Sequence, residues 1–186
     1  MKIISLHETE EALLKKAIQN DAIAQEKLFK RYAPKMLSIC RYYIPDIHYA
    51  EDVMITGFTK VFDKLRQFRF EGSLEGWIRR IMVNESIAFL RSRKPMHFTD
   101  VEEAECIIDA DIDIFTTDDI QQLIDKLPDG YRAVFVMYAI DDYSHKEIAK
   151  LLGISENTSK SQLFKARKML QKQISFNKKM YYEKPV

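Results

Sequence analysis

The sequence predicts an all-α protein made of two small helical domains joined by an acidic linker. Lys, Glu, Leu, Ile and Ala are plentiful among the 186 residues, and five glycines are too few for an all-β protein. Apolar residues recur every three or four positions in several segments, which is the period of an amphipathic helix. One acidic stretch without that period, 96–116, separates the helical segments and is the expected linker.

The first helix is expected over residues 8–20. Asp21 can cap a second helix that runs to about residue 43 and is bent or interrupted near Pro34, because proline removes a backbone donor and clashes with the preceding turn. A third helix is expected from "PDIHYAED" to about residue 68. Its apolar stripe has steps of four, three and four residues and consists of Met54, Phe58, Val61 and Leu65.

A loop, "RFEGS", separates the third helix from a fourth. Ser73 is a good N-cap, and Pro95 ends the helix at about residue 93 because proline disfavours helix at the residue before it. The side chains available to the core are Trp77, Ile78, Ile81, Met82, Ala88 and Phe89. For Trp77 and Phe89, core packing is a simpler interpretation than stacking on nucleic-acid bases.

The second half of the chain is expected to resume as helix at about Thr117, and Pro128 suits the first turn of the next helix. Ser144 and Glu147 then have the Ser-x-x-Glu spacing of a capping box. Gly153 can take a positive φ in the turn that follows.

A last long helix starts at Ser155, which can cap it, and is expected to run to about residue 174. Two helices joined by a short turn that contains glycine form a helix-turn-helix. On a helical wheel the last helix has an inward stripe of Ser159, Leu163, Ala166, Leu170 and Ile174. The opposite side carries Asn157, Ser161, Lys165, Lys168 and Lys172.

Phe164 lies off the inward stripe, beside the polar side of that helix. In a major groove a ring can pack on a thymine methyl while Lys and Asn reach base edges and phosphates. The alternative is that Phe164 packs on a neighbouring helix.

The net charge is only +1, but charged residues are grouped into one acidic block and two basic blocks. Residues 99–125 hold ten acids and neither Lys nor Arg. Residues 64–94 hold eight bases and three acids, and residues 144–180 hold nine bases and two acids. A charge run is often only a solvated face, but two basic blocks on either side of an acidic one favour two surfaces for a polyanion.

Motifs of metal-binding sites are present only in part. His145 and Glu147 fit the H-x-E of zinc deaminases, but no P-C-x-x-C accompanies them. "DADIDI" from Asp109 resembles the start of an EF-hand but lacks the glycine and the final glutamate. We therefore expect no metal, no cofactor and no catalysis. Cys40 and Cys106 are expected to be reduced thiols, and without a membrane span or signal peptide the chain is expected in the cytoplasm.

Two segments resemble a known family. "LPDGYRAVFVMYAIDDYSHKEIAKLLGISENTSKSQLFKARKML" resembles region 4 of extracytoplasmic-function (ECF) RNA polymerase sigma factors, of the sigma-70 family. "AEDVMITGFTKVFDKLRQF" and "GSLEGWIRRIMVNESIAFLRSRK" resemble region 2. The resemblance implies region 2 over 1–95, the linker over 96–116, region 4 over 117–176 and a tail over 177–186.

The resemblance also implies partners. Family members bind the clamp and the flap of core RNA polymerase, read the −35 element of promoter DNA with region 4, melt the −10 element with region 2, and are held by anti-sigma factors. From its charge, the acidic linker is expected to mask the basic faces in the free protein; the alternative is a disordered, solvated tether with no affinity for either domain. The alternative is a helix-turn-helix regulator that acts without core polymerase and has an amino-terminal interaction domain; an enzyme is the least favoured class.

The resemblance also implies DNA-binding and polymerase-binding residues, which are assigned by their positions in the matching segments. Lys160, Ser161, Phe164 and Lys165 fall where the family contacts −35 DNA, on the side that the wheel identifies. The predicted −35 face is Asn157, Lys160, Ser161, Phe164, Lys165 and Lys168. The predicted −10 surface combines the loop that in the family holds a flipped base with the helix beside it: Arg69, Phe70, Ser73, Arg80, Asn84 and Arg91. The predicted clamp contact is Asp52, Thr56, Thr59 and Asp63.

Among the aromatic residues of region 2, Phe70 is the best candidate for stacking on a base because it lies in the loop; one such stack is worth about 1–3 kcal/mol. The sequence departs from the family at two pairs of positions. The family often has Gln and Glu where Ile55 and Thr56 stand, and Val and Arg where Ser159 and Gln162 stand. The second departure is expected to change base preference more than fold.

Overall fold

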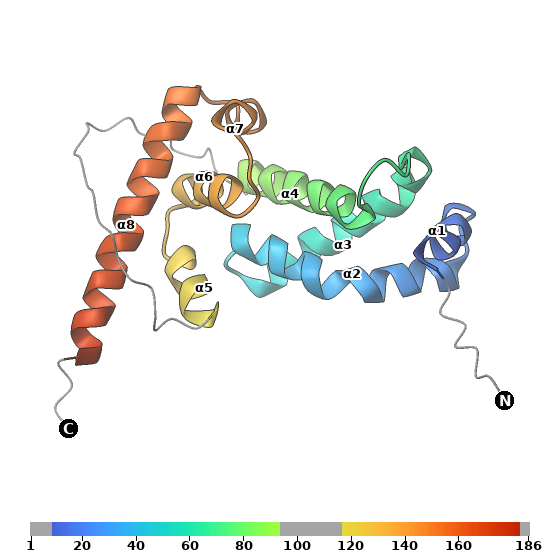
Figure 1. The fold of residues 1–186 in the computed structure, drawn as a ribbon, viewed down its shortest axis with the longest axis horizontal. Coiled ribbons are helices and arrows are strands. Elements are labelled where there is room, and N and C mark those ends of the chain that lie inside the picture. Colours follow the sequence, from blue (N-terminus) through green and yellow to red (C-terminus); the bar gives the residue numbers. More distant parts are fainter. Residues whose placement is uncertain (1–8, 94–116, 183–186) are drawn as a thin grey trace. The chain divides into compact units, whose positions relative to one another are not determined.

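The computed structural model describes residues 9–93 and 117–182, and the side chains of 9–93 and 119–175. Every regular element in these ranges is a helix, in the order α1 to α8 with a short 3-10 helix, η1, after α3 (Figure 1). This confirms the predicted all-α class. The chain divides into two compact units, Met1–Arg41 with Asp46–Ser86, and Tyr42–Pro45 with Ile87–Val186.

The helices of the first unit begin where short polar side chains cap them. The backbone N–H of Ala24 donates to Asp21 Oδ1 at 2.8 Å, as predicted, and Asp46 Oδ1 accepts from the N–H of His48 at 2.9 Å. Ser73 accepts more weakly from Gly76 N–H, at 3.4 Å. The elements are α1 (Glu10–Ile18), α2 (Ala22–Tyr43), α3 (Ile47–Lys64), η1 (Leu65–Gln67) and α4 (Leu74–Arg93).

The expected interruption near Pro34 is wrong, because α2 continues through Pro34 without a break. Proline costs an interior helix a hydrogen bond and a clash with the preceding turn. The turns after Pro34 nevertheless bury Met36, Ile39 and Cys40. Burial of these side chains offsets the local cost of the proline, so packing decides the length of this helix.

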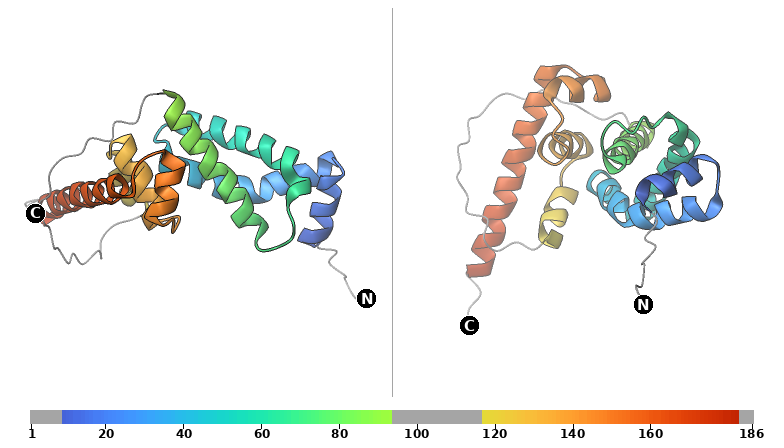
Figure 2. Two further views of the ribbon diagram at one scale, coloured as in Figure 1. Left: turned by 90° about the horizontal axis from the view of Figure 1, so that it is seen from above. Right: turned by 45° about the vertical axis from the view of Figure 1, so that its right-hand side comes forward.

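The core of the first unit lies between α2, α3 and α4, which run side by side in both views of Figure 2. The predicted stripe of Met54, Phe58, Val61 and Leu65 is buried. Phe58 meets Phe29 of α2 edge to face, with ring centroids 4.7 Å apart. Gly57 lets α4 approach closely, since a Cβ there would lie 2.4 Å from the Met82 sulfur.

The inward face of α4 differs in part from the expected one. Ile78 and Met82 are buried, whereas Trp77, Ile81 and Phe89 are half-buried. Ala88 is exposed, contrary to the prediction. The missed apolar core residues of α4 are Leu74, Val83, Ile87 and Leu90.

The second unit packs three shorter helices against a long one. Leu123 and Leu127 form a buried cluster with Ala166 and Leu170 of the long helix, and Phe135 covers it. The elements are α5 (Thr117–Asp125), α6 (Asp129–Ala139), α7 (His145–Leu152) and α8 (Glu156–Tyr182). The helix α8 runs further than the expected end near residue 174. The acidic linker, 96–116, lies outside the described residues.

The caps of α7 and α8 confirm the predicted helix-turn-helix. Ser144 and Glu147 form a capping box at the start of α7, and Gly153 ends that helix in the left-handed region at φ 70°. Ser155 Oγ accepts from the N–H of Thr158 at 2.9 Å and so caps α8. Figure 1 shows α7 joined to the amino end of α8 by this short turn.

The arginine of the "LPDGYR" segment connects α5 to α6. Arg132 is buried, and its Nη1 donates to the carbonyl of Leu127 at 2.7 Å and to that of Asp125 at 3.4 Å. Its Nη2 donates to the Asp129 carboxylate. One guanidinium thus satisfies carbonyls that α5 leaves unpaired at its end and fixes the corner between the two helices.

Candidate nucleic-acid interface

The predicted −35 face forms one accessible side of α8. Asn157, Lys160 and Lys168 are exposed, and Ser161 and Lys165 are half-buried. The opposite stripe of Ser159, Leu163, Ala166 and Leu170 is buried, and Ile174 is half-buried. The structure therefore brings the six predicted residues together on the side of α8 that faces away from its own core.

Phe164 belongs to this accessible side. Its side chain is 36% exposed, which is high for a phenylalanine. An exposed ring between Lys160 and Lys165 places an apolar surface among cations. This arrangement suits a partner that presents both methyl groups and phosphates, as a major groove does.

A cluster that the sequence analysis missed braces the amino end of α7 against α8. His145 Nδ1 lies 2.9 Å from the hydroxyl oxygen of the buried Ser159. The His145 ring stacks on Tyr138, with centroids 4.7 Å apart, and the Arg167 guanidinium lies over the same tyrosine. The cluster fixes the angle at which the turn presents the −35 face.

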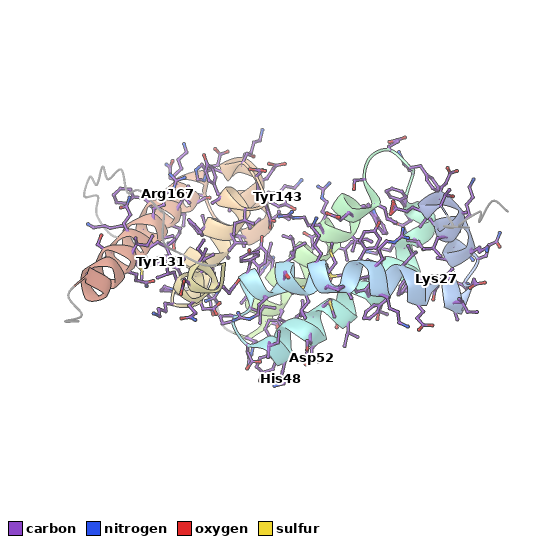
Figure 3. The ribbon with its side chains drawn as sticks, turned by 60° about the horizontal axis from the view of Figure 1, so that its bottom comes forward. Lys27, His48, Asp52, Tyr131, Tyr143 and Arg167 are labelled. Carbon is purple, nitrogen blue, oxygen red and sulfur yellow. The ribbon has the colours of Figure 1, made fainter. Side chains whose placement is uncertain are left out.

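His145 adds no positive charge to this face at neutral pH. Its partial burial lowers its pKa below the ordinary value, and the charges of Lys160 and Arg167 lower the pKa further. Lys160, Lys165 and Lys168 supply the charge of the six-residue face, and the exposed Arg167 lies beside it. Figure 3 shows Arg167 projecting from α8.

Gln162 has the least expected position on α8. It is fully buried, and neither its Nε2 nor its Oε1 has a hydrogen-bond partner. Ser159, the other departure from the family pattern, is fully buried as well. Both side chains pack inside the unit, so neither is open to DNA, and the expected change of base preference stays a prediction.

The predicted −10 surface has a helical part and a loop part. On α4, Arg80, Asn84 and Arg91 are spaced four and seven residues apart, so they share one side of the helix. All three are exposed. Two cations on either side of an amide form a row that can follow a phosphate backbone while the amide reaches a base.

The loop part, 68–73, carries an aromatic row. Phe70 is 49% exposed and has a left-handed backbone, at φ 59°. Its ring lies 5.4 Å from that of the buried Phe68, which lies 5.7 Å from Trp77. Arg69 and Ser73, on either side of Phe70, are exposed. The buried Phe68 and the half-buried Trp77 thus support a ring that is itself open to a partner.

The predicted clamp contact forms one side of α3. Asp52, Thr56, Thr59 and Asp63 are all exposed, and Figure 3 shows Asp52 beside His48 on the outer side of the helix. Ile55 lies among them with 54% of its side chain exposed.

Three other features were sought in the part of the chain that the structure describes: a metal site, a reactive thiolate and a membrane-spanning helix. No group of three or more His, Cys, Asp or Glu side chains there could hold a metal ion. Burial raises the pKa of the Cys40 thiol to about 11, so at neutral pH it is not a thiolate nucleophile. Within the same residues, no helix has the length and apolarity that a bilayer span requires.

Comparison with known proteins assigns a family to both halves. Residues 28–95 match the family model of sigma-70 region 2, and residues 117–170 match that of sigma-70 region 4. The chain is an ECF sigma factor of the sigma-70 family. The two matched ranges contain the residues of the predicted −10 surface and of the predicted −35 face, in the order that the resemblance implied.

Relatives of this sigma factor match it along most of their length. The ECF RNA polymerase sigma factor SigW of Bacillus subtilis is 29% identical over 183 residues, which cover 88% of this chain and 98% of SigW. The ECF sigma-E factor of Escherichia coli is 25% identical, over 89% of this chain and 94% of its own.

The fold matches that of a solved sigma factor. RpoE of Bartonella quintana, in complex with the anti-sigma factor NepR, superposes with a TM-score of 0.53 at 20% identity, over 81% of this chain and 96% of that chain. The matches to region 2 and region 4, and not this likeness of fold, make the sigma factor a polymerase-associated initiation factor that acts at specific promoters.

Proposed function

We propose that α8 of this sigma factor reads the −35 element as duplex DNA. The observation that carries the proposal is the single accessible side of α8, on which Lys160, Phe164 and Lys165 are set apart from the buried stripe. Cations position the helix on phosphates, and the ring and polar side chains reach base edges. The capping box and the His145 cluster hold α8 at a fixed angle to α7.

The −10 element is melted by the first half of the chain together with the polymerase. Melting four or five base pairs costs several kcal/mol, at about 1.4 kcal/mol per step, whereas one stacked base returns about 1–3 kcal/mol. The loop of Phe70 can therefore capture a base but cannot open DNA alone. The row of Arg80, Asn84 and Arg91 tracks the separated strand.

The partners follow from these roles. The exposed side of α3 around Ile55 docks on the polymerase clamp, and the second unit on the flap. An anti-sigma factor, like that bound to the solved RpoE, covers these surfaces in the inactive state. The sigma factor works in the cytoplasm and is not itself an enzyme; the polymerase performs the chemistry.

In vitro transcription with core polymerase on a library of genomic fragments tests the proposal. We expect the chain to direct transcripts from a small set of promoters with common elements at −35 and −10. Tight, selective binding of the free chain to duplex DNA, with no effect of core polymerase, would instead support the helix-turn-helix regulator.

Replacing Lys160 or Lys165 by Ala should weaken binding of the holoenzyme to −35 duplex by about 1 kcal/mol for each lysine. A lysine on phosphate also contributes to the salt dependence, so its loss should flatten the plot of log affinity against log salt concentration. Phe164→Ala should change the preferred sequence more than that slope. Filter binding on a −35 library at several salt concentrations measures both effects.

Lys126→Ala is the matched control, because Lys126 is an exposed lysine of the same unit outside the −35 face. It should change neither affinity nor sequence preference. If the promoter choice of all three −35 variants equals that of the wild type, the assignment of this face is wrong.

Replacing Phe70 or Asn84 by Ala should leave binding to closed duplex promoters intact and reduce open-complex formation by about tenfold, the loss of one base contact. A template whose −10 element is already unpaired should restore much of the lost activity, because the variant then need not trap the first base. Permanganate footprinting of the −10 thymines measures opening directly. Equal defects on duplex and unpaired templates would rule out the capture role.

A further inference from the structure

The side chain of His145 connects the first helix of the helix-turn-helix to the second. It is the first residue of α7, and its Nδ1 lies 2.9 Å from the hydroxyl oxygen of Ser159, a buried residue of α8. Its ring stacks on Tyr138 of α6, with centroids 4.7 Å apart. Residues of two other helices thus hold the ring in place before any partner binds.

The bond to Ser159 directs the other ring nitrogen outward. Nδ1 and Nε2 point to nearly opposite sides of an imidazole, so a ring whose Nδ1 meets a buried hydroxyl turns its Nε2 toward the open side. The ring is half-buried, and none of the residues that the structure describes pairs with Nε2. Nε2 is therefore available to a partner that comes to this side of α7.

The surroundings of His145 keep its ring neutral in the free protein at neutral pH. Its partial burial lowers its pKa, the charges of Lys160 and Arg167 lower the pKa further, and the charge of Glu156 raises it. The net effect is a pKa below the ordinary histidine value. The charged or titratable groups on the three helices around the ring are Tyr138 of α6, Lys146 and Glu147 of α7, and Glu156, Lys160 and Arg167 of α8.

DNA brings the opposite charge to this side of the unit. In a helix-turn-helix the second helix lies in the major groove while the first crosses the phosphate backbone. Lys160 belongs to the predicted −35 face and Arg167 lies beside it. A phosphate that pairs with either cation cancels the repulsion that disfavours the protonated ring, and its own charge attracts a proton to the ring.

We infer that His145 is a further contact of the −35 interface, which takes up a proton from solvent as DNA binds and then donates from Nε2 to a backbone phosphate. The inference rests on the proposed reading of the −35 element by α8 and adds a residue to it. Protonation keeps the link between the helices, because a protonated Nδ1 donates to the Ser159 oxygen, which can accept as well as donate.

The affinity of the holoenzyme for −35 duplex should therefore rise as the pH falls. One proton taken up on binding changes the affinity by at most about tenfold for each pH unit. We expect the wild type to bind about fivefold more tightly at about pH 6 than at about pH 7.5. This gain should shrink at high salt, because screening weakens the attraction between the phosphate and the protonated ring. Filter binding over a pH series at constant salt measures it.

His145→Asn removes the titration and keeps the bond to Ser159, because the asparagine amide takes about the place of Nδ1. Its affinity for −35 duplex should change by less than about twofold over the same pH range. His48→Asn is the matched control, since His48 is an exposed histidine of α3 in the first unit. The control should keep the wild-type dependence on pH.

Calorimetry provides a second readout that a merely structural histidine would not change. Titration of the holoenzyme with −35 duplex, in two buffers of different ionisation enthalpy, counts the protons taken up on binding. We expect the wild type to take up a fraction of one proton more than His145→Asn at about pH 6.5. If circular dichroism shows that the asparagine variant is misfolded, His145→Gln, which does not titrate either, replaces it in both measurements.

The inference would be overturned by a wild-type affinity that does not rise on acidification, or by equal pH dependence and equal proton uptake in the wild type and the variant. A failure of the proposed function has a different result. In that case the wild-type holoenzyme would show no preference for −35 duplex over unrelated duplex at any pH.

Discussion

Arg132→Met should lower the free energy of unfolding of the second unit by about 3 kcal/mol, because the carbonyls of Tyr43 and Leu127 would be left without their buried donor. The carbonyls of Leu127 and Asp125 would lose their donor, and Asp129 would lose its ion pair. Methionine fills much of the same space, so the loss reports mainly on the hydrogen bonds. Native-state hydrogen exchange should show about a hundredfold less protection in α6 and α8.

The single tryptophan of the chain provides an internal control for this measurement. This residue, Trp77, lies in the first unit, so the denaturation midpoint of tryptophan fluorescence should stay unchanged. Arg132→Lys should recover only part of the loss, because an ammonium cannot reproduce the fork of the guanidinium. Unchanged protection of α6 in Arg132→Met would refute the connecting role of this arginine.

Gln162→Met should act in the opposite direction and stabilise the second unit by about 2 kcal/mol, the cost of burying a polar amide without partners. Methionine has nearly the same length and flexibility, so the substitution removes polarity without opening a cavity. Hydrogen exchange of the α8 amides should slow by about thirtyfold.

Gln122→Met is the control for this gain, since Gln122 is exposed on α5 and its replacement should stay within about 0.5 kcal/mol of the wild type. DNA binding should not change in Gln162→Met, because Gln162 lies on the buried side of α8. A loss of stability would mean that the amide finds partners in solution.

Local chemistry made the helix starts predictable. Asp21, Ser144 and Ser155 were recognisable because one side chain reaches one backbone N–H within three residues. Gly153 was recognisable because few other residues adopt its backbone conformation. The accessible side of α8 followed from the helical period alone, since its opposite side has to pack.

Features that depend on contacts between helices were not predictable in this way. The passage of α2 through Pro34 depends on what Met36 and Cys40 bury against. The exposure of Ala88 and the burial of Val83 depend on which neighbours cover α4.

In the candidate sites, periodicity placed Phe164 and Asn84, but it could not reveal that His145 contacts Ser159. These two residues lie on different helices, and only the packing of α7 against α8 brings them together.

The contacts within the second unit have a consequence for its rate of folding. Its main helix pairings, α6 with α8, α7 with α8, α5 with α8 and α6 with α7, all lie within residues 117–182. Chains dominated by such local pairings fold in microseconds to milliseconds, because little loop entropy is lost before contacts form. The capping box and the left-handed Gly153 define the short α7 before any distant segment is needed. The second unit of this sigma factor can thus fold soon after it leaves the ribosome, so its supply to polymerase follows synthesis with little delay.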